Sequence, residues 1–426
     1  MQVSRQDKSP TNVILSIEGR TADLEPIRRH VISHFRRSVR VPGFRAGKAP
    51  DNLIEQHIDQ QAFLDEFMEH ALNELYRQAV ETENIRPVSS PDVRLKKFVP
   101  YSQLEFEADT EILGQIKLPD YKNLKLAKKK AQITDKDINS VIKSLRTKLA
   151  QRLDTGRPAK EGDELTINFE GTDKDGKKIN GAGGQDYALI LGSGTFIPGF
   201  EDNLIGAKAG DTKSFEVTFP KDYGVGILQN KRVTFKVDVT KVQELKEPKI
   251  DNEMAKKAGA FKNLAELRDD IKKQLMLERQ QQLDTDYNNQ LVREIAEKTE
   301  LEVPSSLVKA EIRHLEDQEK QNIIYRGQTW QEHLAEEGLT EEEHSEKKIP
   351  EARERVKIGL ILTEIAEREG ITVTSEEAEI RLQILKAQYQ DPQMQAELDK
   401  PANQREIKAR LLTEKTIAKL RSYTAK

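Results

Sequence analysis

The sequence predicts an elongated, multidomain α+β protein: an α+β domain first, an antiparallel sheet domain in the middle and an all-α domain at the end. Three observations lead to this prediction. The chain has 426 residues, which is longer than one compact domain usually is. Charged residues make up 33% of it and hydrophobic residues only 36%, too few to fill one large core. Of its 23 glycines, 14 lie between residues 156 and 245, so the composition changes in the middle of the chain.

Charge, cysteine content and hydropathy exclude several classes of protein. The chain has 69 basic and 73 acidic residues and a net charge of −4, so it is not a uniformly basic nucleic-acid binder. It contains no cysteine, which excludes disulfides, thiol catalysis and cysteine-bound metals. The polar N-terminal residues are unlike a signal peptide, and no apolar run is long enough to span a bilayer. We therefore expect a soluble cytoplasmic protein that does not enter membranes.

Residues 1–112 are predicted to form the α+β domain. Val13, Leu15 and Ile17 alternate with polar residues, which is typical of a half-buried strand. Thr21 is expected to cap a helix whose apolar residues recur every three or four positions from Leu24 onward. Further helices are predicted near residues 50–60 and 61–84, and further strands around residues 93–99 and 103–112.

Residues 113–155 are predicted to be a linker that contains one amphipathic helix. Pro119 and the basic run Lys128–Lys130 favour extended chain, whereas Thr134 can begin a helix that reaches Leu149. Because one face of this helix is apolar, we expect it to pack against another part of the protein.

Residues 156–245 are predicted to form the antiparallel sheet domain, and residues 246–426 the helical domain. The dipeptide Asp175-Gly176 predicts a turn, and alternating stretches predict strands at residues 165–169, 188–191, 215–219 and 233–239. Beyond residue 246, apolar residues recur at helical spacing in thin stripes, which favours open bundles or arms over a thick core. Helices are predicted after Pro304 and over about residues 350–369, 374–390 and 403–423.

A short loop of unusual composition is predicted between the first two helices. It reads VPGFRAGKAP from Val41 to Pro50 and places Phe44 among glycines and cations. Residues 1–50 carry ten basic and four acidic residues, whereas residues 51–110 carry five and thirteen, so positive charge is concentrated around this loop. One interpretation is an ordinary turn with Phe44 tucked inward. The other is a docking tip, in which an aromatic anchor and cations meet phosphate or acidic groups.

This loop resembles the ribosome-docking signature of the trigger factor family, the bacterial chaperones at the peptide exit tunnel. The signature is G-F-R-x-G-x-x-P, and the string GFRAGKAP matches it. The resemblance implies contact with the large ribosomal subunit at the exit tunnel, through ribosomal RNA and a rim protein, and binding of unfolded nascent polypeptides. The residues that it implies in ribosome binding are Gly43, Phe44, Arg45, Gly47, Lys48 and Pro50.

The glycine-rich domain resembles the FKBP-type prolyl isomerases. The resemblance is carried by NFEG at residues 168–171, by LGSGTFIPGFE at residues 191–201 and by VTFP at residues 217–220. It implies cis–trans isomerisation of X–Pro bonds, a rotation that breaks no bond and needs no cofactor or metal. The N–H of Ile197 is implied as the donor to the substrate carbonyl. The implied pocket residues are Phe169, Tyr187, Phe196, Ile197, Phe200, Tyr223 and Phe235.

Two features of this domain bear on the activity expected of it. The aromatic residues could equally form nothing more than the core of a small sheet domain. In addition, Ile179 and Asn180 stand where FKBP domains usually carry Phe-Asp, so the expected isomerase activity is modest.

The resemblance to trigger factors extends over nearly the whole chain, because short segments of the helical part also match. It implies that the helical domain lies between the other two and forms a client-binding cradle. No cofactor is expected. His30 and His34 are four residues apart and could form a metal pair, but no third ligand is evident beside them, so no metal is expected either.

The predicted function is that of an ATP-independent chaperone and peptidyl-prolyl isomerase. It docks at the ribosomal exit tunnel, keeps nascent chains open, isomerises X–Pro bonds and serves protein folding and export. Two alternatives stay open: a prolyl isomerase that works without the ribosome, and a ribosome-bound chaperone whose isomerase domain is nearly inactive. Homodimerisation away from the ribosome is also left open by the sequence.

Overall fold

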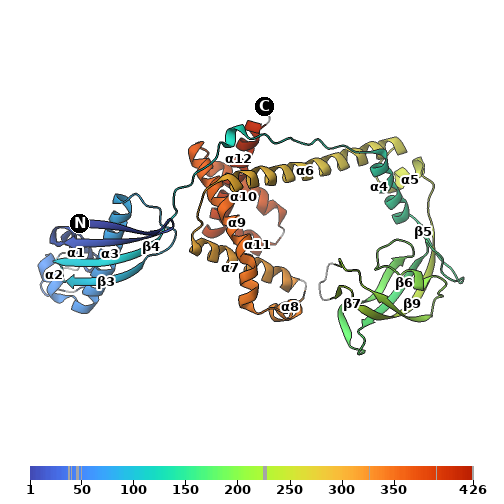
Figure 1. The fold of residues 1–426 in the computed structure, drawn as a ribbon, viewed down its shortest axis with the longest axis horizontal. Coiled ribbons are helices and arrows are strands. Elements are labelled where there is room, and N and C mark those ends of the chain that lie inside the picture. The colour runs from blue at the N-terminus through green and yellow to red at the C-terminus, as the bar shows by residue number, and fades with distance from the viewer. Residues whose placement is uncertain are drawn as a thin grey trace. The chain divides into compact units, whose positions relative to one another are not determined.

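The computed structural model describes residues 1–36, 39, 41–44, 48, 50–223, 228–325, 327–389 and 391–424, without the side chains of residues 51, 52 and 180. The chain divides into two compact units (Figure 1). One comprises residues 1–127 and 288–426, and the other comprises residues 128–287. The prediction of a multidomain α+β protein is confirmed, since the chain forms two separate antiparallel sheets and, from residue 252 onward, a series of helices. Among the helices described, none combines the length and the apolar character needed to cross a membrane.

The first unit begins with an antiparallel sheet and three helices. These elements are β1 (Gln2–Ser9), β2 (Asn12–Arg20), α1 (Thr21–Phe35), α2 (Asp51–His57), α3 (Gln60–Thr82), β3 (Asp92–Val99) and β4 (Gln103–Glu111). The strand order is β1-β2-β4-β3. Val13, Leu15 and Ile17 are fully buried on one face of β2, as their alternation predicts. They form a core with Phe106 of β4 and Leu75 of α3, so the helices cover this face of the sheet.

Two details of this part differ from the prediction. Thr21 is the first residue of α1 rather than its cap, because Arg20 occupies the cap and its N–H donates to Asp23 Oδ2 at 3.0 Å. The Thr21 hydroxyl instead donates to the carbonyl of Ser102 at 3.3 Å. Strand β1 was not predicted, since it is rich in charged residues and almost all of them are exposed, which hides the usual alternation.

The first unit continues with helices of seven to 28 residues and one 3₁₀ turn after the sheet. These are the 3₁₀ turn η1 (Tyr121–Asn123), α7 (Ser305–Tyr325), α8 (Trp330–Glu337), α9 (Glu341–Arg368), α10 (Ser375–Gln388), α11 (Pro392–Leu398) and α12 (Pro401–Thr424). Helix α9 begins well before the predicted position near residue 350, and Pro350 lies inside it. The reason is a capping box: Glu343 accepts the Thr340 N–H at 2.9 Å, and Thr340 Oγ1 accepts the Glu343 N–H at 3.2 Å.

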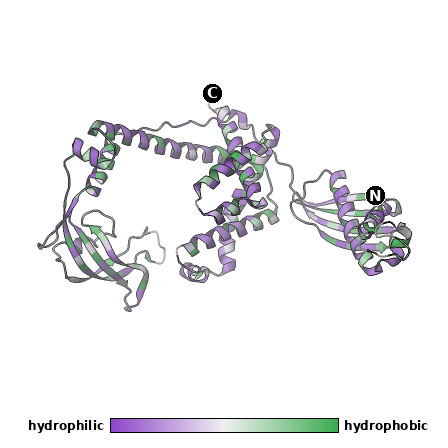
Figure 2. Cartoon of the chain, turned by 180° about the vertical axis from the view of Figure 1, so that it is seen from behind, coloured by the Kyte–Doolittle hydropathy of each residue, from purple (hydrophilic) through white to green (hydrophobic). Residues whose placement is uncertain are grey.

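Apolar residues follow narrow stripes on these helices, and hydrophilic residues dominate the rest of their surface (Figure 2). The core between α7 and α9 is correspondingly small, with Val308, Leu315 and Ala352 as buried members. Polar interactions therefore carry a larger share of the contacts between these helices than in a thick bundle.

The second unit contains an antiparallel sheet of five strands. Its elements are α4 (Asp135–Lys148), β5 (Gln151–Asp154), β6 (Glu164–Thr172), β7 (Lys178–Ile190), the 3₁₀ turn η2 (Asp202–Leu204), β8 (Thr212–Thr218), β9 (Arg232–Lys246), α5 (Asn252–Ala258) and the first part of α6 (Leu264–Lys298). The order is β5-β9-β6-β7, and β8 pairs with β9. Gly176 has φ of +78° between β6 and β7, where Asp175-Gly176 predicts a turn. Strand β5 falls in the stretch expected to be a linker, yet it pairs with the end of β9.

The predicted amphipathic helix is α4. Thr134 caps it, because its hydroxyl oxygen accepts the Asp137 N–H at 3.3 Å. Ile138 and Ile142 are buried in a cluster with Met254 of α5 and with residues of α6. The expectation that this helix packs against another part of the chain is therefore confirmed.

Candidate functional site

The loop between α1 and α2 presents Phe44 to solvent. The Phe44 side chain is 45% exposed, so the interpretation in which it is tucked inward is wrong. The Phe44 N–H donates to the carbonyl of Val41 at 3.2 Å, and Gly43 has φ of +85°, a value that glycine adopts without strain. Lys48 is exposed, and Pro50 caps α2 rather than standing in its first turn. Two residues implied in docking, Arg45 and Gly47, lie outside the described residues.

The helices on either side of this loop are fastened to each other. Arg28 of α1 donates two hydrogen bonds to Glu55 Oε1 of α2, at 2.6 and 3.0 Å, and a third to Oε2 at 2.7 Å. The hydrogen bonds with Glu55 raise the pKa of Arg28, and the guanidinium lies 4.7 Å from the centre of the Tyr101 ring. Val41, at the start of the loop, is buried in a small apolar cluster with Ile54. These contacts hold α1, α2 and Val41 together, which favours a defined position for Phe44.

The second candidate site is an aromatic cluster on the sheet of the second unit. Phe169 lies on β6, Tyr187 on β7 and Phe235 on β9, while Phe196 and Phe200 follow β7. The ring centres of Phe196 and Phe200 are 4.3 Å apart in a stacked arrangement. Those of Phe169 and Phe196 are 5.3 Å apart, those of Tyr187 and Phe196 also 5.3 Å, and those of Phe200 and Phe235 5.2 Å. Five of the residues implied by sequence are therefore brought together.

Burial within this cluster is graded. Phe200 and Phe235 are buried, at 0% and 3% exposure, whereas Tyr187 is 39% exposed. Phe169 and Phe196 are partly buried between these extremes. A pocket has buried rings as its floor and half-exposed rings as its rim, and the edge of an ordinary core shows the same gradient.

Two further aromatic residues belong to the cluster and were missed by the sequence reasoning. The Phe215 ring centre is 5.3 Å from that of Phe200, and the Phe219 ring centre is 4.7 Å from that of Tyr223. Both stand on the predicted strand at residues 215–219, so their alternation was the signal that could have identified them. Tyr223 and Ile197 pack against the same core.

The backbone at Ile197 offers a free donor. The Ile197 carbonyl accepts the Phe200 N–H at 3.1 Å, which forms a turn. Among the residues that the structure describes, no acceptor is found for the Ile197 N–H itself. A free N–H next to aromatic rings can hold a carbonyl oxygen of a bound peptide.

Glu201 holds the loop that carries Phe196, a role that the sequence reasoning did not assign. Its carboxylate accepts the N–H groups of Gly192 at 2.8 Å, Thr195 at 2.9 Å and Phe196 at 3.2 Å. Burial by itself would raise the pKa of Glu201, but these and other hydrogen bonds outweigh it and hold the pKa below its usual value. The loop is consequently tied to a charged group rather than to apolar contacts alone.

Glycine permits one close approach inside the cluster. A Cβ atom on Gly184 would lie 2.8 Å from Phe169 Cε1, closer than real Cβ contacts. Phe169 can therefore occupy its position because residue 184 has no side chain. Ile179, a departure from the usual FKBP pattern, is partly buried against the same core, and the Asn180 side chain lies outside the description.

The histidine pair considered in the sequence lies on α1. The rings of His30 and His70 are 5.4 Å apart, and His34 contacts the carboxylate of Glu66. His70 Nε2 is 3.9 Å from Glu66 Oε1, which is a long contact, and the side chains of His34 and His70 are largely exposed. Its four members do not bring three ligand atoms to one centre among the described residues.

Comparison with protein families assigns all three parts of the chain. Residues 1–145 match the model described as bacterial trigger factor protein, and residues 263–422 match that of the bacterial trigger factor C-terminus. Residues 155–240 match the model of FKBP-type peptidyl-prolyl cis-trans isomerase. The chain therefore contains an FKBP-type domain between two trigger factor regions.

Individual relatives agree over most of the length. The trigger factor of Halothermothrix orenii is 32% identical over 90% of this chain and 89% of its own. That of Carboxydothermus hydrogenoformans is 31% identical over 92% of each chain. A solved structure described as "Promiscuous Substrate Recognition in Folding and Assembly Activities of the Trigger Factor Chaperone" is 20% identical over 99% of each chain, with a TM-score of 0.49.

Proposed function

Because this chain belongs to the bacterial trigger factor family, we propose that it is a cytoplasmic, ATP-independent chaperone that docks at the ribosomal exit tunnel and isomerises X–Pro bonds in nascent chains. Each activity rests on a different part. The loop around Phe44 docks, the aromatic cluster isomerises, and the helical part after residue 246 holds clients. Protein folding and export are the processes it serves.

Docking rests on the exposure of Phe44. An aromatic side chain that is 45% exposed on a short loop, which also carries the exposed Lys48, has little to contribute to its own domain. The ring can insert into an apolar crevice of a rim protein, while the cation meets phosphate of ribosomal RNA. The hydrogen bonds between Arg28 and Glu55 hold α1 and α2, the helices on either side of the loop, against each other.

Isomerisation rests on the graded aromatic cluster, which is the single observation that carries the proposed activity. Rotation about an amide bond has a barrier of about 18–20 kcal/mol because of conjugation. A proline ring seated against Phe169 and Phe196, above the buried Phe200, loses water around its imide. The twisted transition state is less polar than the planar ground state. The free Ile197 N–H can hold the carbonyl oxygen of the residue before proline. No proton transfer is needed, which agrees with the apolar character of the cluster.

Holding rests on the thin apolar stripes of the helical part. Exposed apolar side chains occur on α10 at Ile380 and Ile384, which are 54% and 51% exposed. Scattered apolar groups of this kind can bind unfolded segments weakly without fixing one sequence.

The experiment that tests the isomerase assignment compares two activities in one full-length variant. Phe196→Ala removes a ring that contacts three other rings, so kcat/KM for an X–Pro peptide should fall by roughly tenfold. Suppression of aggregation of a proline-free client should stay unchanged, because the helical part is intact. Glu170→Gln is a matched control in the same domain, since Glu170 only pairs with Lys178 at the surface, at 2.8 Å. An unchanged kcat/KM in Phe196→Ala would contradict the proposal and favour a chaperone with an inactive isomerase domain.

A further inference from the structure

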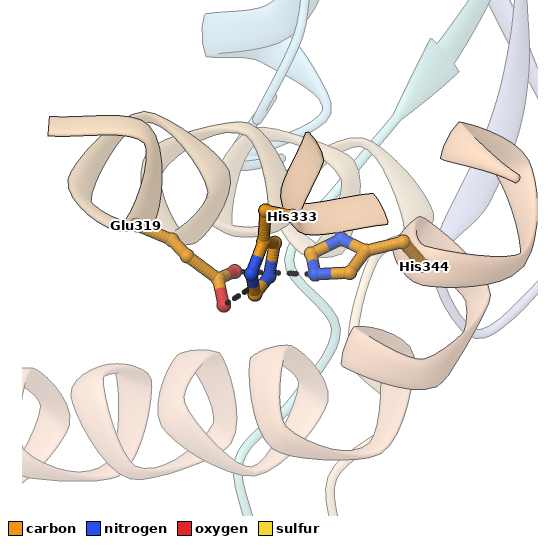
Figure 3. A group of neighbouring side chains, drawn as sticks. All are labelled: Glu319, His333 and His344. Atoms are coloured by element: carbon orange, nitrogen blue, oxygen red, sulfur yellow. Dashed lines mark ion pairs between the residues drawn. The ribbon is translucent and has the colours of Figure 1, made fainter. Parts of the chain in front are cut away.

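Three side chains that can bind metal meet in the helical part of the first unit. Glu319 of α7, His333 of α8 and His344 of α9 point toward one another (Figure 3), and one ligand atom of each lies within 4.8 Å of the other two. His333 Nε2 is 3.6 Å from Glu319 Oε1, and His344 Nε2 is 3.3 Å from Glu319 Oε2. Two ligand atoms on a tetrahedral zinc ion are roughly 3.4 Å apart, given bond lengths of about 2.1 Å. The two short separations reach different oxygens of Glu319 and are close to that value, and the three ligand atoms, now within 4.8 Å of one another, would draw closer around one ion.

Two nitrogen atoms of this cluster are buried and lack hydrogen bonds among the described residues. His344 is only 3% exposed. His333 Nε2 and His344 Nδ1 are each shielded from solvent and have no hydrogen-bond partner in the part of the chain that the structure describes, whereas Glu319 Oε2, which is also shielded, lies 2.7 Å from the Lys348 ammonium nitrogen. One such atom is costly, so two in one place need an explanation. A bound cation would satisfy Glu319 and His333 at once.

Local sequence signals fix the two histidines. Thr329 caps α8 through a capping box with Glu332, which places His333 in the first turn, where its N–H donates to the Thr329 carbonyl at 3.1 Å. Thr340 caps α9 in the same way, and the His344 N–H donates to its carbonyl at 3.0 Å. Because each helix begins at its own cap, His333 and His344, eleven positions apart in sequence, both lie in the first turn of their helices.

Neighbouring side chains orient the imidazole rings. Trp330 stacks on His333 with ring centres 5.5 Å apart and meets His344 edge-on at 4.8 Å. Glu316 Oε1 lies 3.9 Å from His344 Nδ1 and accepts a hydrogen bond from the Ser345 hydroxyl. At 3.9 Å this carboxylate is too far to accept a hydrogen bond from His344 Nδ1. Moved closer, it would supply the usual support of a metal-bound imidazole, a carboxylate that accepts a hydrogen bond from the nitrogen that does not bind the ion.

We propose that Glu319, His333 and His344 form a binding site for a divalent transition-metal ion, with Zn²⁺ as the best match. Two imidazole nitrogens and one carboxylate oxygen are the donors that such ions prefer, whereas Mg²⁺ and Ca²⁺ prefer oxygen alone. A cavity of about 310 Å³ lies beside Glu319 and His333 and leaves room for water as a fourth ligand.

The ion would fasten helix α8. This helix has eight residues and none of them is buried, so apolar packing attaches it weakly to its neighbours. A metal that joins His333 to Glu319 of α7 and His344 of α9 supplies the missing attachment. Binding of the ion is therefore coupled to the docking of α8.

Lys348 competes with the metal. Its Nζ atom lies 2.7 Å from Glu319 Oε2, and its side chain is 20% exposed, so it can swing toward solvent. The ammonium group neutralises Glu319 when no metal is bound and must leave when a cation arrives. Removing it should strengthen metal binding by roughly tenfold or more, because a positive charge no longer opposes the ion.

The test uses the full-length chain, freed of metal by a chelator and titrated with Zn²⁺ or Co²⁺ alone. The chain has one tryptophan, Trp330, and it contacts both histidines, so its fluorescence reports on this site and on no other histidine group. We expect a saturable change with one ion per chain that EDTA reverses, and visible absorption bands of four- or five-coordinate Co²⁺. Zn²⁺ should also raise the temperature of unfolding of the helical part.

Variants separate a metal site from a structural polar cluster. His333→Gln and His344→Gln should each weaken Zn²⁺ binding at least tenfold, whereas Lys348→Met should strengthen it. The matched control is His34→Gln with His70→Gln, which removes the exposed histidines near Glu66 and should leave the Trp330 response unchanged. The absence of any saturable response in the unmodified chain would overturn the proposal, whether or not the variants fold. So would equal binding by His333→Gln, or weaker binding by Lys348→Met.

Discussion

Glu201→Gln should release the loop that carries Phe196 without unfolding the sheet. Four backbone N–H groups, from Gly192, Gly194, Thr195 and Phe196, donate to the Glu201 carboxylate at 2.8 to 3.2 Å. Hydrogen bonds to a charged acceptor contribute about 1.5–3 kcal/mol each, but these four share two oxygens and border on water. We therefore expect a joint loss of about 2–4 kcal/mol in the opening free energy of the loop.

Hydrogen exchange of the loop amides measures this loss directly. Protection over residues 192–196 should fall by roughly 30- to 800-fold in the variant, which is the expected free energy expressed as a ratio. Amides of β6 and β9 should exchange as before. Glu170→Gln on β6 is the control, because it removes a carboxylate of the same domain that holds no loop. A loss of protection below threefold would refute the role assigned to Glu201.

The dependence of loop protection on pH, measured in acid, tests the same role of Glu201. The pKa of Glu201 is lower in the folded protein than in the unfolded chain, because backbone donors outweigh the effect of burial. Its contribution is therefore complete above the unfolded value, about 4.3, and is lost as the pH falls through the folded value. After correction for intrinsic exchange, protection of the loop should decline in acid in the unmodified chain and stay flat in Glu201→Gln.

Three other predictions concern packing and charge. Gly184→Ala should push the Phe169 ring aside and lower kcat/KM for an X–Pro peptide several-fold, whereas Gly156→Ala, whose new Cβ would meet nothing within 4 Å, should have no effect. Ile142→Ala should lower the free energy of unfolding of the α4–α5–α6 cluster by about 2–4 kcal/mol in urea titrations. Glu369→Gln should lower thermal stability at neutral pH, because hydrogen bonds from a lysine and two tyrosines hold the pKa of Glu369 at about 2. The stability difference between variant and unmodified chain should shrink as the pH falls from about 4.5 toward that value.

Elements with one buried face were predictable from sequence. Strand β2 and helix α4 bury one side against a core, so their apolar residues recur at the period of the element. Strand β1 was missed because it lies at the sheet edge with both faces largely exposed, and burial imposes no pattern there. The early start of α9 was missed because its first turns are polar and only the capping box at Thr340 marks it.

Site residues could be predicted when they stand together in one sequence motif. They could not be predicted when the fold brings them together from separate segments. Phe196, Ile197 and Phe200 stand in one continuous segment, so a resemblance could identify them together. Phe215 lies outside the motifs and reaches the cluster because β8 pairs with β9, whereas Phe219, the residue after β8, stands in the VTFP motif of residues 217–220. Glu319, His333 and His344 are spread over three helices, and no ligand spacing in the sequence announces them.

Ribosome co-sedimentation tests the central claim most directly. The full-length chain should pellet with ribosomes, and pelleting should weaken as salt rises, because cations on the loop meet phosphate. Phe44→Ala combined with Arg45→Ala and Lys48→Ala should abolish pelleting while circular dichroism stays unchanged. Leu95→Ala is the matched control, since Leu95 is 52% exposed on β3 of the same sheet domain and lies outside the loop. Pelleting of the triple variant at the level of the unmodified chain would contradict the account and leave an isomerase that works without the ribosome.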